Sequence, residues 1–161
     1  MKKTALLLCV LMLLGLLAAC GEKVEYRDDV KISNLCGTVE SGMDRDSLAE
    51  MNSGYLSGAM HLDPSMFADY VVKINAYGVN IDEYGIFKAR SADEVADVKE
   101  AVEGYLQLRR DAWMDEYMPE EKPKLEKAEI KVCGRYVIYV IMSDEARQAA
   151  FENFEKMLTV K

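Results

Sequence analysis

The sequence predicts an α+β domain in which three helices accompany an antiparallel four-stranded sheet, in the order α-β-β-α-β-β-α. Four segments either alternate between apolar and polar residues or are apolar throughout, as strands do. They fall into two pairs, each joined by a turn. A long segment with apolar residues at helical spacing separates the pairs, and shorter helical segments stand before the first pair and after the second. Such an order favours hairpins in one sheet with helices packed against it.

Two of the predicted helices are marked at both ends. The first follows Asp28 and Asp29 and is expected to end near Gly42. Its apolar stripe comprises Ile32, Leu35, Cys36 and Val39. The long middle helix begins at a capping box of Ser91 and Glu94 and ends at Pro119. Its stripe comprises Val95, Val98, Val102, Tyr105, Leu106, Trp113 and Tyr117.

The last helix starts at the cap residues Ser143 and Asp144. Its stripe comprises Ala150, Phe151, Phe154, Met157 and Leu158.

The strands are expected over residues 66–76, 81–89, about 128–132 and 136–142. Residues 77–80 form the turn of the first pair, and Gly134 lies in the turn of the second. The last segment is apolar on both faces, which is typical of a central strand. We therefore expect a helix or a partner to cover both of its sides.

The first strand suggests a binding surface. Asp69, Val71 and Lys73 share one face with Phe67 and Asn75, and the apolar set Tyr70, Val72 and Ile74 shares the other. If all three helices pack on the Tyr70 face, the opposite face stays open as a mixed apolar and polar surface. Exposed apolar area of this kind often marks an interaction site. Asp69, Val71 and Lys73 are therefore candidate binding residues.

The N-terminus carries an export signal. Lys2 and Lys3 precede an apolar run over residues 4–18, which is the order of a secretory signal. The run is shorter than the roughly 20 apolar residues that a spanning helix needs. It ends in Leu17-Ala18-Ala19-Cys20, which resembles the lipobox of bacterial lipoproteins. The resemblance implies cleavage between Ala19 and Cys20 and a diacylglyceryl group on the Cys20 thiol.

These features divide the chain into three parts: a lipoprotein signal peptide over residues 1–19, a short polar tether over 20–29, and a single α+β domain over 30–161. Two acyl chains anchor a protein stably where one is marginal. We therefore expect the mature protein at the outer face of the cytoplasmic membrane. Its expected partners are the membrane, through the lipid anchor, and an envelope protein or cell-wall component.

Charge and cysteine content exclude several classes of function. The formal net charge is −8, so nucleic acid is not an expected partner. No glycine-rich phosphate loop follows a strand, and we expect no cofactor. Of four cysteines, Cys9 leaves with the signal and Cys20 is lipidated, so Cys36 and Cys133 remain in the domain. We expect both to be reduced packing residues, with a single disulfide between them as the alternative.

Three short patterns resemble a known family. They are Asp82-Glu83-Tyr84-Gly85-Ile86-Phe87-Lys88-Ala89 before the capped helix, Tyr117-Met118-Pro119-Glu120-Glu121, and Gly134-Arg135-Tyr136-Val137. Together they resemble the domain-of-unknown-function 4358 family, whose members are lipoproteins of Gram-positive anaerobes. The resemblance extends from about the first helix to the last one and implies fold and location. Because the family has no assigned activity, it implies no site residue. Cys133 departs from the pattern, since a polar residue is expected in that turn.

Candidate catalytic and metal-binding groups are sparse. His61 is the only histidine, and Asp63 is placed to orient its ring. The alternative, a loop histidine before a turn, is favoured because no nucleophile or metal-ligand spacing accompanies it. A zinc site would need more His or Cys ligands than the domain contains.

Two carboxylate patterns and one aromatic pattern have alternative explanations that involve no binding site. Asp44, Asp46 and Glu50 lack the spacing of a calcium loop, so helix capping and solvation are favoured. A paired-carboxylate site would require Asp82 and Glu83 to face Asp69 on the neighbouring strand. Tyrosines on the strands form either a ligand platform or ordinary half-buried packing, which we favour. They are Tyr70, Tyr84, Tyr136 and Tyr139.

The function expected from these observations is that of a lipid-anchored cell-envelope protein with a non-catalytic binding or interaction domain. One alternative is a carboxylate-dependent envelope hydrolase, and another is a structural envelope component. A deep pocket with convergent carboxylates would favour the hydrolase over the binding domain.

Overall fold

The computed structural model describes residues 24–41, 43–77 and 80–160. Within these residues the chain forms five α-helices and five strands. The helices are α2 (Ile32–Val39), α3 (Ser53–Gly58), α4 (Val95–Asp111), α5 (Lys122–Glu126) and α6 (Asp144–Leu158). The strands are β1 (Leu48–Glu50), β2 (Phe67–Asn75), β3 (Glu83–Ala89), β4 (Glu129–Cys133) and β5 (Tyr136–Ile141).

The strands form one antiparallel sheet in the order β1-β2-β3-β5-β4. The α+β class and both hairpins, β2–β3 and β4–β5, are confirmed. The predicted strand number is wrong, because β1 adds a fifth strand beside the C-terminal half of β2. Three residues are too few to show a period in the sequence, which is why β1 was missed.

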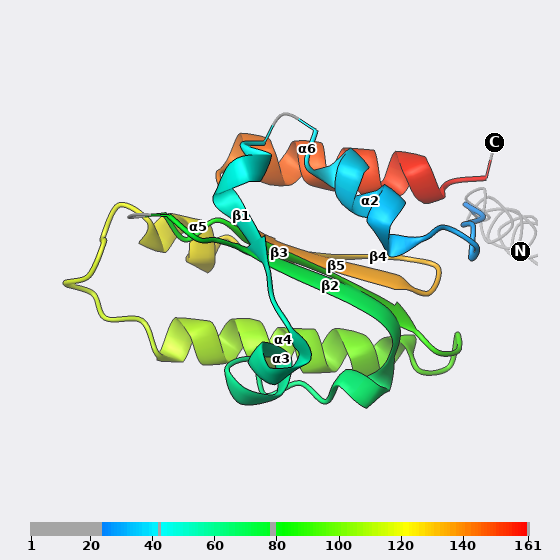
Figure 1. Cartoon of the computed structure of the whole chain (residues 1–161), viewed down its shortest axis with the longest axis horizontal. Coiled ribbons are helices and arrows are strands. Elements are labelled where there is room, and N and C mark those ends of the chain that lie inside the picture. Colours follow the sequence, from blue (N-terminus) through cyan, green and yellow to red (C-terminus); the bar gives the residue numbers. More distant parts are fainter. Residues whose placement is uncertain (1–23, 42, 78–79, 161) are drawn as a thin grey trace, which may run out of the picture.

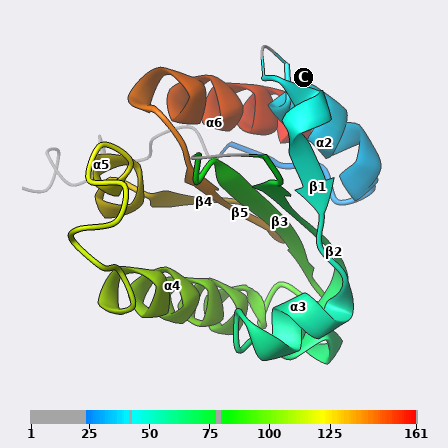
Figure 2. The same ribbon diagram turned by 60° about the vertical axis from the view of Figure 1, so that its left-hand side comes forward.

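The helices lie on both faces of the sheet, so the molecule has three layers (Figures 1 and 2). Helices α2 and α6 cover one face, and α3 and α4 cover the other. The prediction that one face stays open is therefore wrong. All six residues of β5 are buried, as expected for a central strand, and helices rather than a partner cover its two sides.

Each face has its own apolar core. The face under α2 and α6 buries Val71, Tyr84, Ile86, Tyr136, Ile138 and Val140. The face under α3 and α4 buries Phe67, Val72, Phe87, Val137, Tyr139 and Ile141. Phe67 was expected beside Val71, but an irregularity between Phe67 and Asp69 turns it to the other face.

Several predicted helix boundaries are corrected. Helices α3 and α5 were not predicted, because each is too short to show a stripe. Helix α4 ends at Asp111 rather than Pro119, which leaves Trp113 half-buried beyond the helix and Tyr117 exposed. Its N-cap is Glu94 itself, and Ser91 donates to the Glu94 carboxylate instead of completing a capping box. The Ser143 cap of α6 is confirmed.

The expected tether is partly ordered against the domain. The Arg27 N–H donates to the Leu158 carbonyl at 2.7 Å, and the Val160 N–H donates to the Glu25 carbonyl at 2.9 Å. Arg135 donates to the Asp28 carboxylate at 2.7 Å and thereby holds the pKa of that carboxyl below its usual range. Residues 25–28 of the expected tether are therefore part of the folded structure.

The signal peptide, Ala19 and Cys20 lie outside the described residues. Of the helices that are described, none is long and apolar enough to cross a membrane.

Candidate functional site

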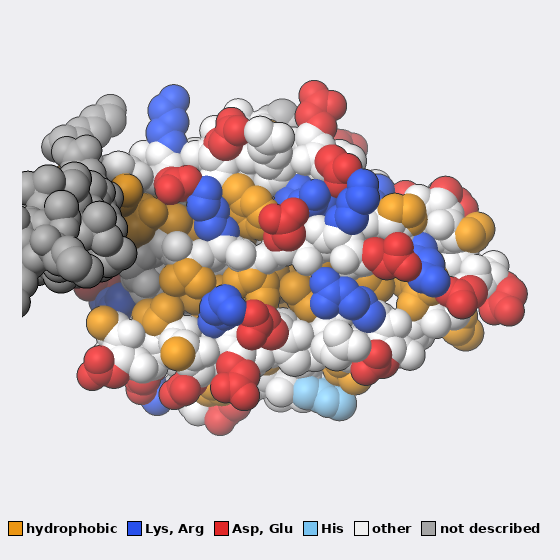
Figure 3. Space-filling view, turned by 180° about the vertical axis from the view of Figure 1, so that it is seen from behind, with side chains coloured by type: hydrophobic (Ala, Val, Ile, Leu, Met, Phe, Trp, Pro, Cys, Tyr) orange, Lys and Arg blue, Asp and Glu red, His pale blue; other side chains and the backbone are white. Residues whose placement is uncertain are grey.

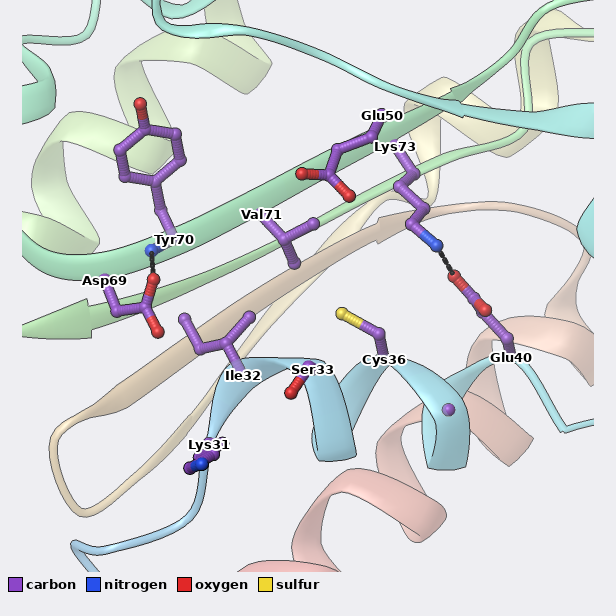
Figure 4. Close-up of a pocket in the computed structure, with 11 residues that line it drawn as sticks. Lys31, Ile32, Ser33, Cys36, Glu40, Glu50, Asp69, Tyr70, Val71 and Lys73 are labelled. Carbon is purple, nitrogen blue, oxygen red and sulfur yellow. Dashed lines mark hydrogen bonds and ion pairs between the residues drawn. The ribbon is translucent and has the colours of Figure 1, made fainter.

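A groove of about 650 Å³ lies between α2 and β2 (Figure 4). Its volume is in the range of small-molecule and peptide sites. Its lining brings together all three candidate binding residues of the first strand with one side of α2 and the end of β1. The lining residues are Lys31, Ile32, Ser33, Cys36, Gly37, Glu40, Glu50, Asp69, Tyr70, Val71 and Lys73.

The floor of the groove is apolar. Val71 points from β2 towards α2, where Ile32 and Cys36 point back at it (Figure 4). These three side chains belong to the core under α2 and α6, and only 5% of the Val71 surface is exposed. Alternation along β2 places Asp69 and Lys73 on the same face, so charged groups flank this floor on either side.

Glu40 closes one end of the groove. It directly follows α2 and is 5% exposed. Its Oε1 accepts hydrogen bonds from Lys73 Nζ at 2.6 Å and from the Tyr84 hydroxyl at 2.5 Å. Arg45 Nε lies 3.7 Å from its Oε2. The Glu40 carboxylate is therefore neutralised by cations, and Lys73 is committed to it rather than free for a partner.

The titrating side chains beside Glu40 are held in their neutral forms. Burial, followed by the hydrogen bond to Glu40, raises the pKa of the Tyr84 phenol well above its usual value. Burial also raises the pKa of the Cys36 thiol and, away from Glu40 in the same core, of the Cys133 thiol. Both cysteines are free and buried, as expected of packing residues. A neutral, buried thiol is a poor nucleophile.

Three other charged side chains of the groove are not engaged in ion pairs. Asp69, Glu50 and Lys31 take part in no ion pair among the described residues. The Asp69 carboxylate accepts a hydrogen bond from the Tyr70 backbone N–H at 2.9 Å. The Glu50 side chain extends from β1 into the groove (Figure 4). The two acidic groups therefore lie beside an apolar floor without an ion-pair partner among the described residues, although Lys88 and Lys73 stand opposite them in the strand pairs and are bound to Asp28 and Glu40.

A second buried carboxylate lies on the opposite face of the sheet. Glu83 begins β3 and is 1% exposed. Its Oε1 accepts from the hydroxyls of Tyr105 and Tyr139, each at 2.5 Å. Arg109 Nη1 donates to Oε2 at 2.7 Å and to the Tyr105 hydroxyl at 3.1 Å. Glu83 thus joins β3, β5 and α4 through groups that satisfy one another.

The chemistry of this second cluster is structural. Burial is the largest cause that raises the pKa of the Tyr105 and Tyr139 phenols, and the charge of Glu83 adds to it. The same charge raises the pKa of Arg109 against the opposing effect of burial. Neutral phenols and a charged guanidinium therefore surround the Glu83 carboxylate, and both of its oxygens accept hydrogen bonds from them.

The paired-carboxylate site that the sequence left open does not form. Asp69 lies opposite Lys88 at one end of the β2–β3 pair, whereas Glu83 lies opposite Ile74 at the other end. The two side chains also point to opposite faces. Asp82, next to Glu83, forms an ion pair with Lys124 at 2.9 Å.

The remaining candidates have structural roles. His61 is an exposed loop residue with a φ of 55°, and the Asp63 carboxylate accepts from the Ser65 N–H instead of orienting its ring. Within the described ranges, no three His, Cys, Asp or Glu side chains converge to hold a metal ion. The strand tyrosines do not form a platform, since Tyr84 and Tyr136 face α2 and α6 while Tyr139 faces α4.

Sequence reasoning missed Glu40, Tyr105 and Arg109 as members of these clusters. Glu40 follows the last stripe residue of the predicted helix, and this position was the only signal for its burial. Arg109 lies four residues after Tyr105, so the two share one side of α4. Nothing in the sequence indicates that Glu83 lies beneath them.

The fold and the groove define a three-layer α+β domain with a binding-sized groove beside one edge of its sheet. The chain belongs to the family described as Domain of unknown function (DUF4358), whose family model matches residues 41–142, more than half of the chain. This match contains all five described strands and the Glu83 cluster, while α2 and α6 lie outside it. No curated protein and no solved structure matches the chain.

Proposed function

We propose that the protein is a lipid-anchored domain at the outer face of the cytoplasmic membrane, which binds an envelope partner in the groove between α2 and β2 without catalysing a reaction. The groove carries the proposal: an apolar floor at Val71 lies beside the carboxylates of Asp69 and Glu50, which form no ion pair among the described residues. An apolar side chain of the partner would leave water on this floor, which stabilises a complex, and charges without an ion-pair partner select which partner binds.

The location rests on the order of n-region, apolar run and lipobox at the N-terminus. A lipid on Cys20 would hold the domain close to the headgroups, because few residues separate Cys20 from the ordered segment that begins near Glu25. The groove would then face partners within the envelope rather than distant ones.

Replacing Cys20 with alanine is expected to abolish lipid attachment, because the thiol that receives the lipid is lost. Metabolic labelling with a fatty-acid analogue measures it. Cys36→Ala is the matched control and is expected to keep the label, since Cys36 is a buried core residue. Label that persists on the Cys20→Ala protein would show that the anchor is elsewhere or absent.

Photo-crosslinking in intact cells tests the groove. Ser33 is exposed on α2 at the groove, and Ser57 is exposed on α3, across the sheet. A photoreactive amino acid at position 33 is expected to give a reproducible adduct, identified by mass spectrometry, that the same amino acid at position 57 does not give. Equal adducts from both positions, or none from position 33, would contradict the proposal.

A further inference from the structure

The N-terminal half of β2 is an open sheet edge. Strand β1 pairs only with residues 73–75 of β2. The last backbone bond across this boundary runs from the Met51 N–H to the Val72 carbonyl at 2.8 Å, and the chain then turns away into α3. Ala68 and Asp69 are exposed. This edge borders the groove between α2 and β2.

The direction of the free backbone groups follows from the pairing. The Ala76 N–H donates to the Ser47 carbonyl, and the Val72 carbonyl accepts from Met51, so these residues turn their backbones towards β1. Groups on a strand alternate in direction, so Tyr70 turns the same way. No described strand lies opposite Tyr70, and its N–H donates to the neighbouring Asp69 carboxylate.

We propose that an extended peptide segment of the partner, with an apolar side chain and a basic one two residues apart, adds to the sheet at this edge. The proposal rests on the groove of the preceding section and names what enters it. Adding a strand to an exposed edge supplies main-chain hydrogen bonds, and pockets for alternate side chains supply specificity. The added strand continues the line of β1 opposite residues 67–71.

The groove determines the side chains of the added strand. The residue opposite Val71 points towards α2, where Ile32 and Cys36 complete an apolar pocket (Figure 4). Two residues along, the side chain on the same face meets the Asp69 carboxylate, with Glu50 in the same groove. A lysine or arginine there would give Asp69 the ion-pair partner that it does not have among the described residues. Without a bound peptide, the Asp69 carboxylate accepts from the Tyr70 N–H and so protects the edge from pairing with unrelated strands.

A second copy of this chain fits the edge poorly. Antiparallel pairing of two β2 edges would bring the acidic groups of both copies together, in a protein whose formal net charge is −8. The other sheet edge, β4, differs in its charges. Glu129 is paired with Arg147 at 3.0 Å, and Lys131 is paired with Glu155.

Figure 3 views that side of the molecule and shows apolar side chains between rows of mixed positive and negative charge. At the β4 edge these charges have ion-pair partners, whereas Asp69 and Glu50 beside the β2 edge have none among the described residues.

The test uses the lipidated protein in detergent micelles and a library of displayed random decapeptides. Peptides of the apolar-x-basic pattern are expected to be enriched over micelles without protein. The strongest is then synthesised with one N-methyl group at each backbone position in turn. Methylation at every second residue within the paired segment is expected to weaken binding about tenfold or more, because it removes an edge hydrogen bond. Methylation at intervening residues is expected to change binding little.

Charge variants identify the edge. Asp69→Asn and Glu50→Gln are each expected to weaken binding of the basic peptide about threefold to fivefold, and less at high salt. Asp97→Asn, an exposed change on α4, is the matched control and is expected to leave binding unchanged. Three results would each overturn the proposal. They are no enrichment of such peptides, N-methylation that weakens binding without a two-residue period, and peptide binding that is unaffected by the Asp69 and Glu50 changes. If peptide binding fails but position 33 still gives its crosslink, the groove remains a binding site for a partner that is not an extended strand. If both the peptide binding and the crosslink fail, the proposed function is contradicted as well.

Discussion

Replacement of Glu83 with alanine is expected to lower the free energy of unfolding by about 3–5 kcal/mol, the cost of breaking a buried ion pair by removing one partner. The change leaves the hydroxyls of Tyr105 and Tyr139 without their acceptor, and it leaves Arg109 beside an empty position. Each unpaired buried group adds a desolvation cost. Urea unfolding, followed by circular dichroism, measures the difference.

Two further variants distinguish the loss of the buried Glu83 network from the loss of a negative charge alone. Asp82→Ala removes the adjacent carboxylate, which is partly exposed and paired with Lys124, and is expected to cost about 1 kcal/mol or less. The triple change Glu83→Leu, Tyr105→Phe, Tyr139→Phe removes acceptor and donors together and is expected to cost less than Glu83→Ala alone, because Arg109 is 27% exposed and reaches water. Equal costs for Glu83→Ala and Asp82→Ala would contradict the buried network.

The hairpins could be predicted because their signal is local. Alternation along residues 66–76 and the turn at Gly134 each lie within a few residues, and both correspond to pairs in the structure. The distribution of helices over the two faces depends on contacts between distant segments, so the sequence left it open. The fourth predicted strand nevertheless indicated that both faces of the sheet are covered. Its two apolar sides require cover on both faces, and α2, α6 and α4 provide it.

The site was predictable only from one of its walls. Strand alternation groups Asp69, Val71 and Lys73 on one face, and all three line the groove. The opposite wall comes from α2, and β1 contributes Glu50; neither element's position follows from a local period. Lys73 illustrates the consequence. Its sequence context suggests a free surface cation, whereas in the fold it is bound to Glu40, which lies far away in the chain.

Helix ends were less predictable than helix cores. The stripe from Val98 to Leu106 is buried as expected, but Trp113 continues the same spacing and lies beyond the end of α4. Apolar spacing does not distinguish a further helical turn from a loop that packs beside the helix. The basic residues Arg109 and Arg110 in the last turn are consistent with a helix end there, because cations are favoured at the C-terminus.

Raising the pH above about 10 is expected to unfold the protein over a narrow range. The pKa values of Tyr84, Tyr105 and Tyr139 are raised, chiefly by burial, so these phenols stay neutral in the folded protein at pH values where they ionise in the unfolded chain. Their contribution to stability is complete below the unfolded pKa of about 10 and is lost as the pH rises from there towards the folded values. Each phenol lowers the free energy of unfolding by about 1.4 kcal/mol per pH unit in that window, so three together give about 4 kcal/mol per unit.

Urea unfolding at a series of pH values from neutrality upwards measures this slope, and the ultraviolet absorbance of tyrosinate reports ionisation at the same time. Tyr84→Phe is expected to reduce the slope by one phenol, whatever it does to stability at neutral pH. Tyr77→Phe is the matched control and is expected to leave the slope unchanged, because 69% of the Tyr77 surface is already exposed in the folded chain. In the wild-type protein, ionisation of the three buried phenols should coincide with unfolding. If their tyrosinate absorbance instead rose while circular dichroism still showed the native fold, the phenols would be titrating in place, and burial beside the two carboxylates would not be holding them neutral.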